Sequence, residues 1–219
     1  GVVVTAAMRL LGDLDEAVDE LGPGAHLLVL DVTDEQSVAR AANQVPRLDV
    51  LVNNAGISDT GQPPSQSDMA TVRQVYETNV FGVLSVTNAF LPALRRSAHP
   101  RIVNISSGTG SLGWSTGPNP HFDHDTHGAF AAYRSSKAAL NALTIFYAQE
   151  LAAQGSMKVN ALAPGLRATH LNSRAAEHGG DPAVAATEAV RLALLDDDGP
   201  TRCFLLLGQQ HRVLVNPDA

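Results

Sequence analysis

Short apolar runs alternate with stretches of helical periodicity along most of the chain, and this alternation limits the possible folds more than any other feature. The runs expected to form strands are residues 2–5, 26–30, 48–52, 101–105, 158–161 and 203–207. The stretches expected to form helices are residues 14–21, 37–45, 68–96, 131–154 and 182–195. Such alternation predicts an α/β fold with a doubly wound, Rossmann-like parallel sheet that has helices on both faces.

Composition limits the function further. A length of 219 residues with 44% hydrophobic residues predicts one domain over residues 1–219 with a sizeable core. The net charge of -7 and the lack of a basic stretch argue against nucleic acid and anionic membranes as partners. The single cysteine, Cys203, rules out an internal disulfide. Because no apolar run could span a bilayer and no signal peptide is visible, we expect a cytoplasmic location.

The residues that directly follow the expected strands are the first candidates for function. In an open parallel sheet, ligands bind beyond the carboxyl ends of the strands. The residues at these positions are Asp31, Asn53-Asn54-Ala55-Gly56, Ser106-Ser107-Gly108 and Pro164-Gly165.

Tyr133 and Lys137 lie four residues apart in an expected helix, so both side chains belong to one helix face. A nearby ammonium favours the phenolate and lowers the pKa of a tyrosine, which is otherwise near 10. Ser107, from a separate strand end, could hold the oxygen of a substrate. Because a cofactor can deliver hydride without a protein nucleophile, the three residues predict a proton-transfer site for a carbonyl group. Ser107 is not a hydrolase nucleophile, since no Gly-x-Ser-x-Gly motif surrounds it.

The order of these motifs along the chain resembles the short-chain dehydrogenase/reductase family from Val2 to about Pro200. The motifs that carry the resemblance are Asn53-Asn54-Ala55-Gly56, Asn79-Val80-Phe81-Gly82, Ser106-Ser107, Tyr133-x-x-x-Lys137 and Pro164-Gly165. The resemblance implies that Tyr133 is the general acid/base and that Lys137 lowers its pKa and binds the nicotinamide ribose. It also implies that Ser107 stabilises the substrate oxygen, while Asn79 holds a water in a proton relay.

The resemblance further implies a nicotinamide cofactor and a small carbonyl or alcohol substrate. Asp31 and Val32 are then expected at the adenine. Asn53, Ala55 and Gly56 would lie beside the adenosine, and Pro164, Gly165 and Thr169 beside the nicotinamide. The choice between NAD and NADP depends on the end of the strand that begins near Val2, because an acidic residue there binds the free ribose hydroxyl. No acid is present and Arg9 is near, which favours NADP.

The start of the chain departs from the family pattern. The family opens with a strand, a Gly-rich turn and a helix, whereas residues 1–6 resemble its second strand. We therefore expect an N-terminally incomplete domain that lacks the first strand and the phosphate-binding turn. Either the sequence is a truncated form of a complete enzyme, which the intact downstream residues favour, or the protein is a non-catalytic dinucleotide-binding or regulatory relative.

An insertion precedes Tyr133, since Ser107 lies 26 residues before it (133 − 107) and the usual family gap is about half that. The insertion resembles that of carbonyl-reductase-like members, where it shapes the substrate pocket and can block subunit packing. Pairing of two copies through the long helices and a monomeric state therefore both remain open. His121, His124 and His127 lie in this insertion, but we expect a histidine-rich loop and no metal site.

Overall fold

The structure, a computed structural model, describes residues 5–8, 25–119 and 127–207. All strand pairs in this part of the chain are parallel, in the orders β1-β2 and β3-β4-β5-β6. The strands are β1 (Thr5–Met8), β2 (His26–Val29), β3 (Val50–Asn53), β4 (Arg101–Ile105), β5 (Lys158–Ala163) and β6 (Phe204–Leu206). The predicted parallel α/β sheet is confirmed. The helix expected over residues 14–21 lies outside the described residues.

Two strands carry side chains that are more exposed to solvent than their apolar sequences suggest. Apolar strands of a parallel sheet are usually buried on both faces, yet Val29 of β2 is 43% exposed and Val52 of β3 is 42% exposed. Among the described strands, β2 pairs only with β1 and β3 pairs only with β4. Both are therefore edge strands of their sheets in the described part of the chain.

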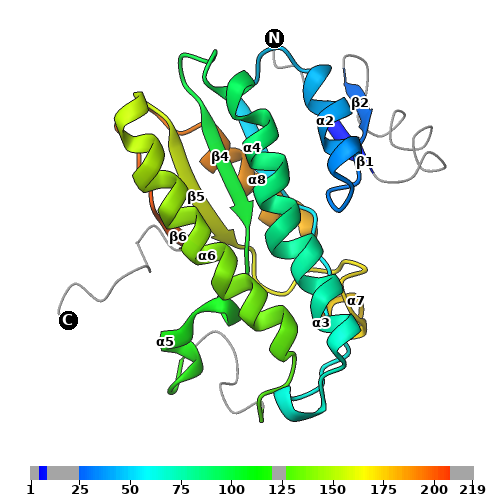
Figure 1. Ribbon diagram of the computed structural model, residues 1–219. Coiled ribbons are helices and arrows are strands. Elements are labelled where there is room, and N and C mark those ends of the chain that lie inside the picture. The colour runs from blue at the N-terminus through cyan, green and yellow to red at the C-terminus, as the bar shows by residue number, and fades with distance from the viewer. Residues whose placement is uncertain (1–4, 9–24, 120–126, 208–219) are drawn as a thin grey trace.

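Helices on both faces of the sheet form most of the remaining structure. Figure 1 shows α4 and α6 in front of the sheet and α8 behind it. The helices are α2 (Glu35–Asn43), α3 (Met69–Tyr76), α4 (Gly82–Leu94), α5 (Leu112–Ser115), α6 (Ala131–Leu151), α7 (Ser173–His178) and α8 (Pro182–Ala193). Short 3-10 turns are η2 (Pro64–Gln66), η4 (Gly108–Gly110) and η5 (Ala152–Gln154). Asp34, Asp68 and Asp181 cap α2, α3 and α8 through side-chain bonds to backbone N–H groups, which explains where these helices begin.

The long helix expected over residues 68–96 is not uniform. Between α3 and α4 the chain forms a π-helical segment, η3 (Glu77–Phe81), which contains Asn79. Such segments often occur at functional sites because they displace one residue from the regular helical register. Apolar periodicity could not predict the segment, since α3 and α4 continue on either side of it.

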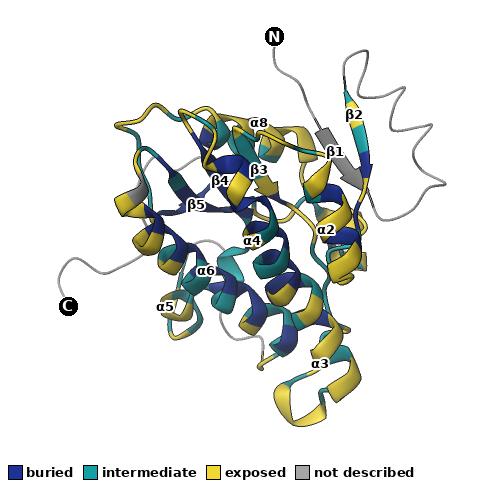
Figure 2. Ribbon diagram, turned by 45° about the horizontal axis from the view of Figure 1, so that its top comes forward, coloured by how far each residue is buried: buried dark blue, intermediate teal, exposed yellow. Residues whose placement is uncertain are grey.

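The core lies on both faces of the four-stranded sheet, because successive strand residues point to opposite faces. Ile102 of β4 packs with Leu94 and Leu151 on the α4 and α6 side. Val103, the next residue, packs with Leu192 of α8 on the other side. Figure 2 shows these buried residues concentrated in β4, β5 and the helix faces turned toward them.

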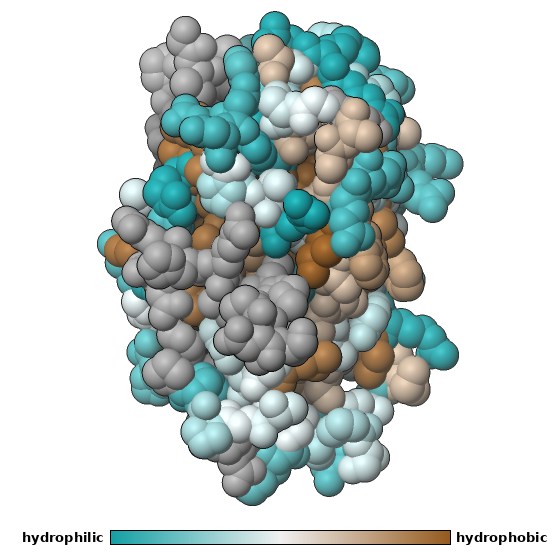
Figure 3. Space-filling model, turned by 90° about the vertical axis from the view of Figure 1, so that its left-hand side faces the viewer, coloured by the Kyte–Doolittle hydropathy of each residue, from teal (hydrophilic) through white to brown (hydrophobic). Residues whose placement is uncertain are grey.

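Some apolar side chains remain on the surface. Phe146 on the outer face of α6 is 59% exposed, and Phe81 in η3 is 52% exposed. Figure 3 looks onto the side of the molecule that carries α6, where hydrophobic residues gather between hydrophilic ones. None of the helices in the described ranges is both long enough and apolar enough to cross a bilayer.

Candidate active site

The candidate residues meet at the carboxyl end of the four-stranded sheet. Asn53 is the last residue of β3, and it lies beside Asn104 of β4 in the strand register. Ser107 follows β4 by two residues, and Pro164 follows β5 directly. The first turns of α6 bring Tyr133 and Lys137 to the same edge, because α6 packs against both η4 and β5.

The hydroxyl of Ser107 is the hydrogen-bonding group that acts on the pKa of the Tyr133 phenol. Burial raises the pKa of Tyr133 above its usual value, because the phenolate loses hydration, and the bond to Ser107 lowers it in part. The structure thus brings together the side chains of Ser107 and Tyr133, which are 26 residues apart in sequence (133 − 107).

Lys137 lies on the same side of α6 as Tyr133, with its Nζ 5.7 Å from the centroid of the tyrosine ring. Its side chain is buried, and Nζ donates a hydrogen bond of 2.9 Å to the backbone oxygen of Ile105. Burial lowers the pKa of Lys137 to about 8. Burial and the effect of Ser107 are therefore the influences that shift the pKa of Tyr133, whereas the sequence led us to expect that the ammonium lowers it.

Asn79 is fully buried and holds the loop after β3 in place. Its Oδ1 accepts a hydrogen bond from the N–H of Ile57, and its Nδ2 donates to the oxygen of Ile57, both at 2.9 Å. Nδ2 also donates to Oγ of Ser136 on α6 at 3.0 Å. The side chain thus connects η3, the loop and the catalytic helix. Its expected role in holding a water stays a prediction.

The turn after β3 shows two different environments. The side chain of Asn53 lies between the sheet and α4, where Nδ2 donates to Thr87 Oγ1 at 3.1 Å and to Asn104 Oδ1 of β4 at 2.8 Å. Ala55 is exposed. A Cβ at Gly56 would lie 3.3 Å from Lys137 Nζ, so a side chain here would press on the ammonium. Asn53 therefore supports the turn from inside, while Ala55 and Gly56 form its outer part.

The remaining cofactor candidates lie at the outer ends of the strands. Asp31 accepts hydrogen bonds from the N–H and the hydroxyl of Thr33, at 2.9 and 2.7 Å, and so stabilises the turn after β2. Val32 packs against Gly82, where an added Cβ would lie 2.9 Å from Val32 Cγ2. Beyond β5, Gly165 has a φ of +71° that favours glycine.

Thr169, the last cofactor candidate, is exposed in the same loop beyond β5. Arg167 donates to the Pro164 oxygen at 2.6 Å and holds that loop in shape. The loop therefore has a hydrogen-bonded base and an exposed outer part, and its contact with the nicotinamide stays a prediction.

Sequence reasoning missed two residues that contact the site. Asp59 Oδ2 accepts a hydrogen bond of 3.0 Å from the N–H of Tyr133, and Oδ1 accepts one of 2.9 Å from the N–H of Gly61. It supplies the cap of α6, because Phe130 at the N-cap position makes no side-chain capping bond. No local signal could reveal a contact across 74 residues.

The second residue is Thr109, whose Oγ1 lies 2.9 Å from Ser107 Oγ. A signal for this residue was present in the sequence, because a hydroxyl residue two positions after a serine commonly forms a local turn with it.

The residues present fit a nicotinamide dinucleotide. Ser58, in the loop after β3, has a buried Oγ for which the structure shows no hydrogen-bond partner. A buried hydroxyl is normally paired with a protein, water or ligand atom. The Lys137 ammonium has three donors, and the bond to Ile105 uses one of them. Among the described residues, no group of His, Cys, Asp and Glu is arranged to hold a metal ion, and His121 and His124 lie outside them.

Comparisons with known proteins agree with this geometry. The family model described as short chain dehydrogenase matches residues 1–179. Short-chain dehydrogenase anuI of Penicillium roqueforti is 37% identical over 172 residues, which cover 74% of this chain and 67% of that protein. Salutaridine reductase of Papaver bracteatum is 32% identical in an alignment that covers 93% of this chain and 86% of that protein.

Solved structures show the same fold. The NADPH-bound carbonyl reductase from chicken fatty liver superposes with a TM-score of 0.77 at 26% identity, covering 94% of this chain and 85% of that one. The sequence match, the parallel sheet and the grouping of residues at its carboxyl end thus lead to one classification. The chain belongs to the short-chain dehydrogenase/reductase family and is an NAD(P)-dependent oxidoreductase that acts on alcohol or carbonyl groups.

Proposed function

We propose that the protein interconverts a carbonyl compound and the corresponding alcohol, with Tyr133 as the general acid/base. The observation that carries this proposal is the convergence of the Tyr133 phenol, the Ser107 hydroxyl and the Lys137 ammonium at one edge of the sheet. Salutaridine reductase and the chicken carbonyl reductase support a reductase activity through their names.

A bound nicotinamide supplies the hydride for reduction of a carbonyl carbon, or accepts it in the reverse reaction. During reduction, the Tyr133 O–H donates its proton to the carbonyl oxygen while the Ser107 hydroxyl holds that oxygen. During oxidation, the phenolate of Tyr133 accepts the proton of the alcohol. Burial opposes the phenolate, so a hydrogen bond from Ser107 and the positive charge of Lys137 are needed to offset this cost. The remaining donors of Lys137 would bind the hydroxyls of the nicotinamide ribose.

For the cofactor we propose NADP in preference to NAD. The reasons are the lack of an acid at the end of β1, the nearby Arg9 and the NADPH bound to the chicken carbonyl reductase. Arg9 itself lies outside the described residues. The ratio of kcat/KM for NADPH and NADH, measured with one ketone, checks the proposal. A clear preference for NADH would contradict it.

Replacement of Tyr133 by phenylalanine tests the role of the phenol. We expect Tyr133→Phe to lower kcat by about 10²- to 10⁴-fold, the usual contribution of a positioned acid/base, while circular dichroism and cofactor binding stay as in the parent. Tyr147→Phe is the matched control, because Tyr147 lies on the same helix and its hydroxyl bonds to Asn88 at 2.8 Å, away from Ser107. Unchanged turnover in Tyr133→Phe would refute the proposal. Cofactor binding without turnover in the parent would support the non-catalytic alternative.

A further inference from the structure

We propose that Thr109 is a positioning residue that directs the hydroxyl proton of Ser107 toward the oxygen of Tyr133. The inference rests on the proposed role of Tyr133 as acid/base. It adds to that role a third hydroxyl, which the family motifs quoted above do not include. Thr109 is half-buried in η4, two residues beyond Ser107.

The geometry around Ser107 carries the argument. Ser107 caps η4, and its Oγ accepts a hydrogen bond of 3.3 Å from the N–H of Thr109. The same Oγ lies 2.9 Å from Thr109 Oγ1. The same Ser107 hydroxyl is the hydrogen-bonding group that lowers the pKa of the Tyr133 phenol. Thr109 is therefore bonded to the hydroxyl that acts on Tyr133.

A count of donors and acceptors shows which way the proton of the Ser107 hydroxyl points. A serine hydroxyl has one proton to donate and two lone pairs that accept. When Thr109 donates both its N–H and its O–H, both lone pairs of Ser107 are used. The proton of Ser107 then points away from Thr109, toward the phenol oxygen and the substrate oxygen beside it. Donation by Thr109 also polarises the Ser107 hydroxyl, which makes it a stronger donor to a phenolate.

The charged groups near Tyr133 do not duplicate this effect. Lys137 faces the tyrosine ring from the same helix, and the carboxylate of Asp59 binds the Tyr133 N–H from the loop after β3. Neither residue contacts Thr109 through a hydrogen bond in the described part of the chain. A change confined to the Thr109 hydroxyl thus leaves both charges in place.

Two substitutions at Thr109 separate the hydroxyl from the shape of the side chain. Thr109→Val keeps the branched shape and the backbone N–H but removes the hydroxyl, whereas Thr109→Ser keeps the hydroxyl and removes the methyl group. Thr116→Val is the matched control. It makes the same change in the segment after α5, where the Thr116 hydroxyl is exposed and donates only to the Gly113 oxygen, at 3.0 Å.

The first readout is the titration of Tyr133 itself in the cofactor-free protein. Tyrosine isotope-labelled at Cζ is followed by NMR against pH, and the Tyr133 signal is identified by its loss in Tyr133→Phe. We expect the pKa of Tyr133 to rise by about 0.5 to 1 unit in Thr109→Val, the effect of losing one neutral hydrogen bond, and to stay near the parent value in Thr109→Ser and Thr116→Val.

The second readout is steady-state kinetics. We expect Thr109→Val to lower kcat by about three- to tenfold with the KM for cofactor nearly unchanged, and Thr109→Ser to restore turnover. A parent-like titration of Thr109→Val, or a Thr109→Ser variant as defective as Thr109→Val, would overturn the proposal. If the parent shows no turnover at all, the proposed function fails, but the Tyr133 titration still decides whether Thr109 orients Ser107.

Discussion

Among single residues, Lys137 shows most clearly how burial and charge oppose each other at this site. The residue is only 4% exposed, and burial lowers the pKa of its ammonium to about 8. The bond to the Ile105 oxygen compensates only part of the lost hydration. The protein therefore keeps a costly charge close to Tyr133, as expected of a residue retained for function.

The cost of burying the Lys137 ammonium predicts how the free energy of unfolding depends on pH. Between pH 8 and the ordinary lysine value of 10.5, the unfolded chain still holds a proton on Lys137 that the folded chain has released. Folding then releases a proton, so the free energy of unfolding rises with pH in this window. Below the window, the full cost of burying the charged lysine lowers the free energy of unfolding. Relative to Lys137→Met, we expect the parent to gain about 2 kcal/mol between about pH 8 and about pH 10.

Urea denaturation of both proteins at several pH values measures this difference. The series stays below about pH 10, because the raised pKa of Tyr133 lowers stability above it. Parallel curves for the parent and Lys137→Met would show that the lysine is not desolvated as the structure indicates.

At the level of elements, the catalytic geometry depends on how closely η4 approaches α6. Gly110 of η4 lies against the backbone of α6, where an added Cβ would be 2.7 Å from the carbonyl carbon of Lys137 and 2.9 Å from the nitrogen of Ala138. Real Cβ atoms do not come this close to backbone atoms, so only glycine permits the contact. The contact holds Ser107 beside Tyr133, since η4 begins directly after Ser107.

Gly110→Ala should therefore damage stability and activity together. We expect the substitution to push η4 away from α6, to lower the free energy of unfolding by about 1 to 3 kcal/mol and to reduce kcat. Gly113→Ala is the control, because a Cβ at Gly113 of α5 meets nothing within 4 Å. We expect that variant to change stability by less than about 1 kcal/mol. Equal effects of the two substitutions on urea denaturation and kcat would contradict the role of the close approach.

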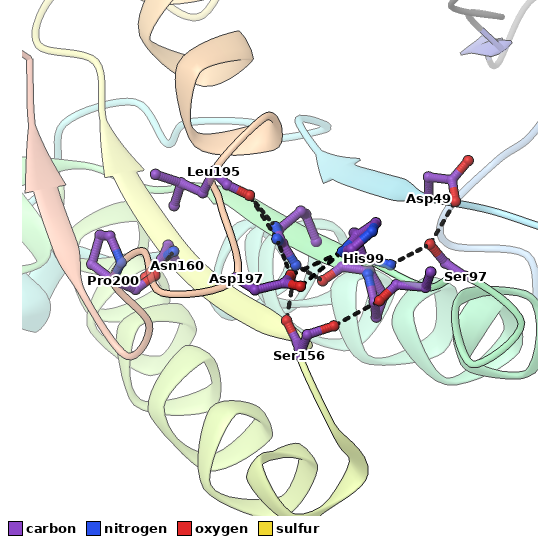
Figure 4. Close-up of polar contacts among 11 residues, drawn as sticks. Asp49, Ser97, His99, Ser156, Asn160, Leu195, Asp197 and Pro200 are labelled. Atoms are coloured by element: carbon purple, nitrogen blue, oxygen red, sulfur yellow. Dashed lines mark hydrogen bonds and ion pairs between the residues drawn. The ribbon is translucent and has the colours of Figure 1, made fainter.

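Across the whole molecule, a buried arginine ties the end of the sheet that lies opposite the active site. Arg101 begins β4 and is 2% exposed. Its guanidinium donates to the Leu195 oxygen at 2.6 and 2.8 Å, to the Ser156 oxygen at 2.8 Å and to Asp197 Oδ1 at 2.8 Å. His99 also contacts Asp197, at 2.9 Å (Figure 4). The network joins the start of β4, the connection before β5 and the connection between α8 and β6.

Arg101→Met should lower stability without affecting the chemistry. The substitution leaves buried carbonyl oxygens without a donor, so we expect a loss on the order of 3 kcal/mol in the free energy of unfolding. We expect kcat/KM to stay near the parent value at temperatures where the variant is folded, because Ser107 lies at the other end of β4. Arg40→Met is the comparison, since the Arg40 side chain is 64% exposed and its pair with Asp34 is 3.7 Å long. We expect that change to cost at most about 1 kcal/mol. A stable Arg101→Met protein, or one with impaired kcat, would contradict the prediction.

The sequence by itself determined the features that depend on local periodicity and spacing. The bounds of β4 and the start of α6 at Ala131 were predicted correctly, and the placement of Tyr133 and Lys137 on one helix face follows from their separation of four residues. The family also followed from the order of motifs, because each motif is a short segment with its own turn or helix geometry. The single-domain organisation and the pairing of copies stay predictions.

Only the tertiary structure decided which distant groups meet and how much water reaches them. The bond from Asp59 to Tyr133 spans 74 residues, and the bonds from Arg101 to the connection before β6 span 94 and 96. Burial, which shifts the pKa values of Tyr133 and Lys137, depends on every element packed around α6. Contacts across such separations and the loss of hydration exist only once the chain is packed, so the local pattern of residues cannot specify them.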